Sequence, residues 1–162
     1  MLTVKFSFMI NDLDLIDRQI LNLLQANARI TTKEISEKLG LTKTPIYERI
    51  KKLERKKIIN KYVTLLDNRQ IELSLVVYIN VLLNRHTKEV VESFEHQVKD
   101  FDEVMECYYI SGNADFLVKV VCKDMDDYHD FIMNKFSIIE NINQFYSSFV
   151  LSEAKKETAF AL

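Results

Sequence analysis

The stretch TTKEISEKLGLTKTPIYERIKKLERKK, residues 31–57, decides the first part of the fold. Thr31 with Glu34 three positions later is the capping box that begins a helix. Gly40 is expected to end that helix, because glycine takes a positive φ without steric cost. Thr42 is expected to cap a second helix, with Pro45 in its first turn, where a missing N–H costs nothing. Two helices joined by a tight glycine turn are typical of a helix-turn-helix DNA-binding motif.

The second of these helices is amphipathic and basic. Ile46, Ile50 and Leu53 recur at i, i+4 and i+7 and are expected to face inward. Alternatives remain for individual side chains: Arg49 can instead pair with Asp17, and much basic helix surface is merely solvated. The outward side chains suit phosphate and base contacts. The candidate DNA-binding residues are Lys43, Thr44, Tyr47 (or a cover for the core edge), Glu48, Arg49, Lys51, Lys52 and Arg55.

Charge divides the chain of 162 residues into two parts. Residues 11–66 carry 12 Lys+Arg and 7 Asp+Glu, whereas residues 67–162 carry 9 and 17. A basic first third suits DNA, and an acidic remainder is expected to have a different partner. We therefore predict an N-terminal extension over 1–10, a DNA-binding domain over 11–66, a linker over 67–73 and a second domain over 74–162.

Several features limit the class of protein. No run of 18 apolar residues occurs, so no membrane span is expected. The apolar start MLTVKFSFMI lacks a cleavage site, so a tail or an added strand is expected there, with Met9 as an alternative first residue. Cys107 and Cys122 are far apart without a nearby histidine, which favours reduced cysteines in a cytoplasmic protein. The sequence predicts neither a metal site nor a cofactor.

The flanks of the basic helix complete the expected first domain. Asp14 can cap an earlier helix, which gives three helices that close one small core. The β-branched residues and Tyr62 of Ile58–Leu66 predict a strand or short hairpin, and hence a winged helix-turn-helix. Lys61 in this wing is a candidate phosphate contact, with a solvated lysine as the alternative.

The second domain alternates strands and helices. The order strand, helix, strand, strand, helix, strand predicts an α+β, ferredoxin-like βαββαβ domain with both helices on one face of the sheet. The first strand has apolar residues on both faces, including Val76, Tyr78 and Leu82 on one of them. An exposed apolar sheet face favours two chains packing sheet to sheet, so we predict an obligate homodimer that reads palindromic DNA. The expected strands are 75–83, 104–110, 116–122 and 144–151, with helices beginning after Thr87 and Asp124.

A turn between two of these strands is a candidate binding site. Gly112 lets backbone N–H groups approach a carboxylate, and Asp115 is a candidate acceptor for an α-ammonium group. An ordinary hairpin turn is the alternative, because glycine, asparagine and aspartate all favour turns.

Three motifs in order resemble the Lrp/AsnC (leucine-responsive, feast/famine) family of transcriptional regulators, over nearly the whole chain from Leu13. They are LDLIDRQIL (13–21), LGLTKTPIYERIKKLERKKII (39–59) and ISGNADFLVKV (110–120). The resemblance implies a regulator of transcription that binds double-stranded DNA, dimerises through its C-terminal sheets and assembles further, commonly to an octamer. It also implies an amino-acid effector bound between dimers. The implied effector residues are Gly112, Asn113, Ala114, Asp115, Met125 and Ser148.

Departures from the family pattern at Asn113, Ala114 and Ser148 suggest a pocket shaped differently from a leucine site, so the resemblance names no ligand. Two other functions compete with an effector-gated regulator. An architectural protein would pack DNA without any effector. A siroheme-decarboxylase-like enzyme would need histidines, and the only ones, His86, His96 and His129, are expected on a loop and on helix surfaces.

Overall fold

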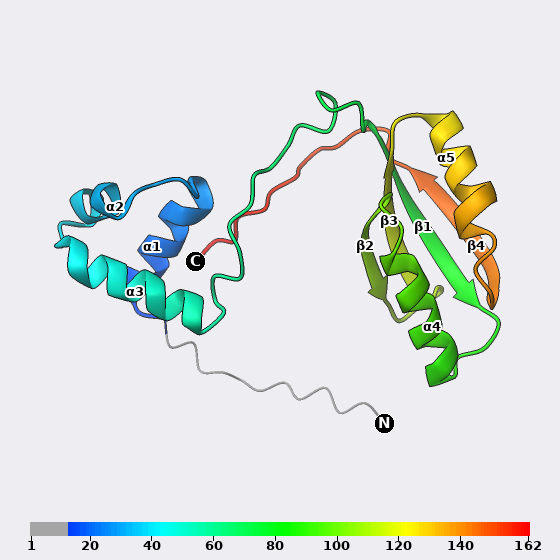
Figure 1. The fold of residues 1–162 in the computed structure, drawn as a ribbon, viewed down its shortest axis with the longest axis horizontal. Helices are drawn as coiled ribbons and strands as arrows, with labels where there is room; N and C mark the ends of the chain where they lie inside the picture. Colours follow the sequence, from blue (N-terminus) through cyan, green and yellow to red (C-terminus); the bar gives the residue numbers. More distant parts are fainter. Residues whose placement is uncertain (1–12) are drawn as a thin grey trace. The chain divides into compact units, whose positions relative to one another are not determined.

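The computed structural model describes residues 13–162, so the predicted extension over residues 1–10 lies outside them. The chain divides into two compact units (Figure 1). Leu65–Ala154 form the sheet unit, while the residues up to Thr64 form the helical unit together with Lys155–Leu162. The chain therefore returns to the helical unit at its C-terminal end, which a single domain over 74–162 did not include.

The helical unit contains α1 (Leu15–Ala26), α2 (Thr32–Leu39) and α3 (Lys43–Arg55). The predicted caps of α1 and α2 are confirmed. The Asp14 side chain accepts a hydrogen bond from the Asp17 backbone at the start of α1. Thr31 and Glu34 form a reciprocal capping box at the start of α2, and Gly40 ends that helix with a φ of 66°.

One small core closes these three helices. Thr42 occupies the N-cap position of α3, but its side chain makes no capping hydrogen bond, so that part of the prediction is wrong. Ile50 is only half-buried, at the margin of the core. The buried apolar side chains come from all three helices and are Ile20, Leu21, Ile35, Ile46 and Leu53.

The predicted wing is wrong for this chain. Residues 58–66 form no strand. A hairpin needs two strands and a turn, and in these nine residues Asn60 is the only turn-forming side chain. The β-branched and apolar side chains that predicted the strand stay exposed, with Val63 54%, Leu65 68% and Leu66 62% accessible. The helical unit is thus a helix-turn-helix followed by an extended segment.

The sheet unit has the predicted order, with a four-stranded antiparallel sheet in the spatial order β2-β3-β1-β4 (Figure 1). A π-helical turn, η1, follows directly on α5, the second helix of this unit. The closing strand begins and ends two residues earlier than predicted. The elements are β1 (Leu75–Leu83), α4 (Lys88–Lys99), β2 (Val104–Tyr109), β3 (Phe116–Cys122), α5 (Met125–Phe131), η1 (Ile132–Phe136) and β4 (Ile142–Phe149).

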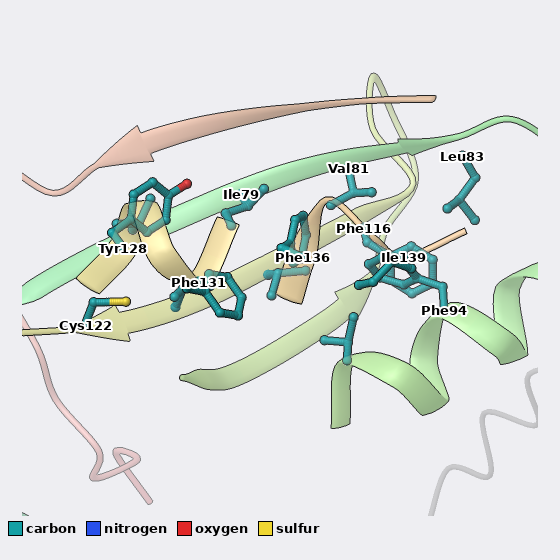
Figure 2. Packing of buried hydrophobic residues seen from close by; sticks show 14 residues of the cluster. Ile79, Val81, Leu83, Phe94, Phe116, Cys122, Tyr128, Phe131, Phe136 and Ile139 are labelled. Atoms are coloured by element: carbon teal, nitrogen blue, oxygen red, sulfur yellow. The ribbon is translucent and has the colours of Figure 1, made fainter. Parts of the chain in front are cut away.

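Both helices pack on one face of this sheet, as predicted. Val77 and Ile79 of β1 are completely buried in the core. Figure 2 shows Ile79 on the side of the sheet where the rings of Phe131 and Phe136 lie. Phe94 of α4 lies with its ring centroid 4.5 Å from that of Phe116 on β3. Because strand side chains alternate between faces, Val76, Tyr78, Asn80 and Leu82 lie on the opposite, open face of the sheet.

The open face carries more polar groups than β1 alone predicted. In one row across the sheet, Tyr78 pairs with Lys119 of β3 and with Ser148 of β4. Lys119 continues the row through an ion pair with Glu106 of β2, with 2.7 Å between Nζ and Oε1. The next row has Asn80 between Leu117 and Tyr146.

Candidate nucleic-acid interface and ligand turn

The solvent face of α3 is one continuous stripe. Helical periodicity of about 3.6 residues per turn brings positions 43, 44, 47, 48, 51, 52 and 55 onto the same side. Ile46 and Leu53 occupy the other side and are buried. The stripe therefore presents lysines, an arginine, a hydroxyl group and an aromatic ring together. Its exposed members are Lys43, Thr44, Tyr47, Glu48 and Arg55, and its half-exposed members are Lys51 and Lys52.

Arg49 lies off this stripe and holds α3 to α1. Its Nη1 atom is 2.6 Å from Asp14 Oδ2 and 2.6 Å from Asp17 Oδ1. Asp17 is only 1% exposed, so its charge requires a partner. The hydrogen bonds that Arg49 donates, first to Asp17 and second to Asp14, raise the pKa of Arg49 above its ordinary value. The geometry thus favours the alternative in which Arg49 forms an ion pair with Asp17 instead of contacting DNA.

Lys51 lies on the stripe but is already paired. Its Nζ atom is 2.7 Å from Glu54 Oε2, and it lies 5.8 Å from the centroid of the Tyr47 ring. The Tyr62 hydroxyl donates to the other oxygen, Glu54 Oε1, at 3.1 Å. The hydrogen bonds from Lys51 and then Tyr62 lower the pKa of Glu54, so the carboxylate is charged.

Lys61 is exposed in the extended segment after α3. Its predicted role depended on a wing lying along the phosphate backbone. Because residues 58–66 form no hairpin, the structure supplies no element that would carry Lys61 in that way.

The turn between β2 and β3 offers unused backbone donors. Gly112 has a φ of 134°, which only glycine adopts without strain. Within residues 13–162, the N–H groups of residues 111–114 donate to no other protein group. Backbone N–H groups without a protein acceptor can donate to water or to an anion such as a carboxylate.

Asp115, at the end of this turn, is already engaged on both carboxylate oxygens. The Leu83 N–H donates to Oδ2 at 2.8 Å, and His86 Nε2 lies 2.8 Å from Oδ1. The Asp115 backbone N–H also donates to the carbonyl oxygen of Val81 at 2.8 Å. Asp115 therefore fastens the turn to the end of β1, and each carboxylate oxygen retains a lone pair that can accept a second donor.

Sequence reasoning missed His86 at this turn. It lies in the loop after β1 and approaches Asp115 only because β1 and β3 are antiparallel neighbours in a particular register. No sequence signal links two residues so far apart. His96 and His129 are exposed on α4 and α5, as predicted.

One chain does not bring the remaining effector candidates to the turn. Met125 begins α5 beyond the far end of β3, about 20 Å from the turn at roughly 3.3 Å per strand residue. Ser148 lies on the open face beside Tyr78. Gly112, Asn113, Ala114 and Asp115 are therefore together by sequence, whereas Met125 and Ser148 can join them only across chains.

The described residues give little evidence of a metal site, a reactive cysteine or a membrane-spanning helix. Among residues 13–162, no group of three or more His, Cys, Asp or Glu side chains is placed to hold a metal ion. Burial raises the pKa of the Cys107 and Cys122 thiols to about 11, so both are protonated and unreactive. None of the helices in this part of the chain combines the length and apolar composition of a membrane crossing.

The Asp115 geometry makes a prediction about stability. Asp115→Ala is expected to lower the free energy of unfolding of the sheet unit by about 2 kcal/mol, because it leaves the Leu83 N–H without its acceptor. The urea midpoint of the sheet unit measures this change, with the exposed Asp126→Ala as the control. An unchanged midpoint would mean that the Asp115 carboxylate does not contribute to stability, and would favour a role in ligand binding.

A helix-turn-helix unit with a basic recognition stripe, joined to a βαββαβ unit with an open turn, defines a DNA-binding protein with a separate ligand-binding domain. The AsnC-type helix-turn-helix domain model matches residues 13–54, and the Lrp/AsnC ligand binding domain model matches residues 76–160. The chain belongs to the Lrp/AsnC family. It is a DNA-binding transcriptional regulator whose activity is modulated by a small ligand.

Similar proteins cover nearly the whole chain. The leucine-responsive regulatory protein of Escherichia coli is 35% identical over 93% of this chain and 92% of its own. The structure of a Neisseria meningitidis transcriptional regulator in complex with L-Met matches with a TM-score of 0.87 and 33% identity, covering 92% of this chain and 96% of that one. Escherichia coli AsnC matches with a TM-score of 0.84 and 26% identity, over 91% and 97% respectively.

Proposed function

We propose that the ligand is a free amino acid whose carboxylate binds the N–H groups of residues 111–114. These donors have no other partner within the described chain, and Gly112 permits the approach of a ligand. The similar Neisseria meningitidis regulator, solved as a complex with L-Met, supports an amino acid as the ligand class. The free N–H groups, which include those of Asn113 and Ala114, are the observation on which this proposal depends.

We further propose that the functional unit is a homodimer that packs sheet to sheet and assembles into a larger ring such as an octamer. The open face offers Val76, Leu82 and Leu117 beside the tyrosines Tyr78 and Tyr146. In such an assembly, Met125 and Ser148 of one chain would complete the turn site of another.

The experiment that tests the ligand is a thermal-shift screen against the twenty amino acids, read beside the mass from light scattering. Binding to the folded state must raise the unfolding temperature by mass action. A stabilising amino acid whose effect disappears in Gly112→Val supports the proposed site. No stabilisation by any amino acid, on an intact oligomer, would contradict it and would favour the architectural alternative.

The proposed DNA contacts make a separate prediction. Lys52→Ala is expected to weaken binding to any DNA sequence and to reduce the slope of log K against log salt by about one, because one phosphate contact is lost. Titrations of a labelled duplex at several salt concentrations measure the slope. Lys88→Ala in α4 is the matched control, and an unchanged slope for Lys52→Ala would exclude a phosphate contact there.

A further inference from the structure

Lys51 is the central basic residue of the recognition stripe, yet it differs from its neighbours. The neighbouring cations Lys43, Lys52 and Arg55 make no ion pair with another described residue. The Lys51 ammonium instead lies 2.7 Å from Glu54 Oε2, three residues further along the same helix. A phosphate can bind Lys51 with full effect only after displacing that carboxylate.

Glu54 is held in this position from outside the helix. Its second oxygen accepts a hydrogen bond from the Tyr62 hydroxyl at 3.1 Å. The Glu54 side chain is 29% exposed and the Lys51 side chain 43% exposed, so the pair borders the solvent face where DNA would bind. With both oxygens engaged, the carboxylate has little freedom to turn away from Lys51.

Tyr62 belongs to the extended segment after α3, whose residues up to Thr64 are part of the helical unit and whose residues from Leu65 onward are part of the sheet unit. This segment has no strand partner within the described chain, and backbone hydrogen bonds from Ile58 and Ile59 to the Leu53 carbonyl hold its start. Further along, the Tyr62 hydroxyl contacts Glu54. A movement of the segment at Tyr62 would therefore change this hydrogen bond to Glu54.

We propose that Glu54, held by Tyr62, shields Lys51 from DNA phosphate, so that the position of the connecting segment sets how much positive charge α3 presents. When the Tyr62 hydroxyl leaves Glu54, the carboxylate can rotate into solvent and Lys51 becomes available to a phosphate. The device links the segment joining the two units to DNA affinity without any change in the fold of α3.

The first test compares Glu54→Gln in the wild-type chain and in the Lys51→Ala variant. Binding of a random-sequence duplex is measured by fluorescence anisotropy over a range of salt concentrations. In the wild-type background we expect a two- to fivefold rise in affinity and a slope of log K against log salt steeper by about one. In the Lys51→Ala background the steeper slope should be absent. An equal gain in both backgrounds would mean that Glu54 acts only through its general charge, and would overturn the proposal.

A matched control removes a different ion pair. Glu92 pairs with Lys88 at 3.5 Å in α4 of the sheet unit, so Glu92→Gln makes the same charge change and also frees a lysine. It should leave the slope unchanged. Thermal unfolding of each variant checks that the helical unit stays folded.

The second test examines Tyr62. Tyr62→Phe removes only the hydroxyl group and is expected to raise DNA affinity in the same direction as Glu54→Gln, by a smaller factor. In the Glu54→Gln background this effect should vanish, because both changes act through one pair. Additive effects of the two substitutions would show that Tyr62 does not act through Glu54, and would contradict the proposed link between the connecting segment and Lys51.

Discussion

Arg49→Met is expected to lower the free energy of unfolding of the helical unit by about 3 kcal/mol and to leave the stability of the sheet unit unchanged. The substitution keeps the apolar stem of the side chain but removes the charge that lies 2.6 Å from Asp17, a residue only 1% exposed. An unpaired buried carboxylate costs about 3 kcal/mol. A helical unit of this size is stable by only about 5 kcal/mol, so the loss is a large share of the total. Far-ultraviolet circular dichroism and hydrogen exchange of α1 and α3 measure the outcome.

The controls separate the ion pair from the general charge of α3. Arg55→Met removes a positive charge from the exposed face of the same helix and should leave the stability nearly unchanged. The double variant Asp17→Asn with Arg49→Met should recover part of the lost stability, because no buried charge remains unpaired. If Arg49→Met lowered the free energy of unfolding no more than Arg55→Met, the ion pair between Arg49 and Asp17 would contribute nothing to stability.

The same cluster predicts how stability depends on pH. The Asp17 backbone N–H, followed by the Arg49 guanidinium, lowers the pKa of the Asp14 carboxyl. A depressed folded-state pKa means that this stabilisation is present above the ordinary unfolded value of about 4 and is lost as the pH falls further. The unfolding temperature of the helical unit should therefore fall between about pH 4 and pH 2, and less so in Asp14→Ala.

The parts of the fold that sequence predicts well are those decided by residues close in the chain. The Thr31 and Glu34 capping box, the Gly40 turn and the Asp14 cap each depend on three or four consecutive positions. The alternation in β1 also follows from the sequence, but it does not say which face meets the helices. Both faces of β1 are rich in apolar residues, so only packing decides between them.

The prediction of a wing was wrong because residues with a high strand propensity form a strand only where another strand pairs with them. The residues of Ile58–Leu66 suit a strand, but a strand also needs a partner, and none of the described residues 13–162 supplies one. The segment's apolar side chains remain exposed for the same reason.

The candidate sites show the same limit. The α3 stripe follows directly from helical periodicity, so its members were predictable. The engagement of Arg49 by α1, of Lys51 by Glu54, and of Asp115 by the end of β1 depends on tertiary contacts. Residue type made Arg49 a candidate for DNA contact and Asp115 a candidate for ligand binding, but residue type could not show the partners that each already has within the chain.

Consecutive residues of β1 provide the sharpest test of the proposed dimer. Val77 is completely buried beneath the helices, so Val77→Lys should unfold the sheet unit rather than separate two folded chains. Tyr78 is half-buried on the open face, beside Lys119. Tyr78→Glu should keep the fold of a single chain, because the new carboxylate lies on the open face of the sheet, whereas in a dimer it would be buried beside a lysine that is already paired with Glu106.

In a two-fold dimer, each substitution at position 78 occurs twice in the interface. A charge buried there at a cost of about 3 kcal/mol or more per copy should raise the dimer dissociation constant more than a thousandfold. Sedimentation and light scattering should find folded monomers for Tyr78→Glu, with circular dichroism like that of the wild type. Assembly unaffected by Tyr78→Glu would mean that the open face is not the dimer interface, because a desolvated carboxylate could not be accommodated there without loss.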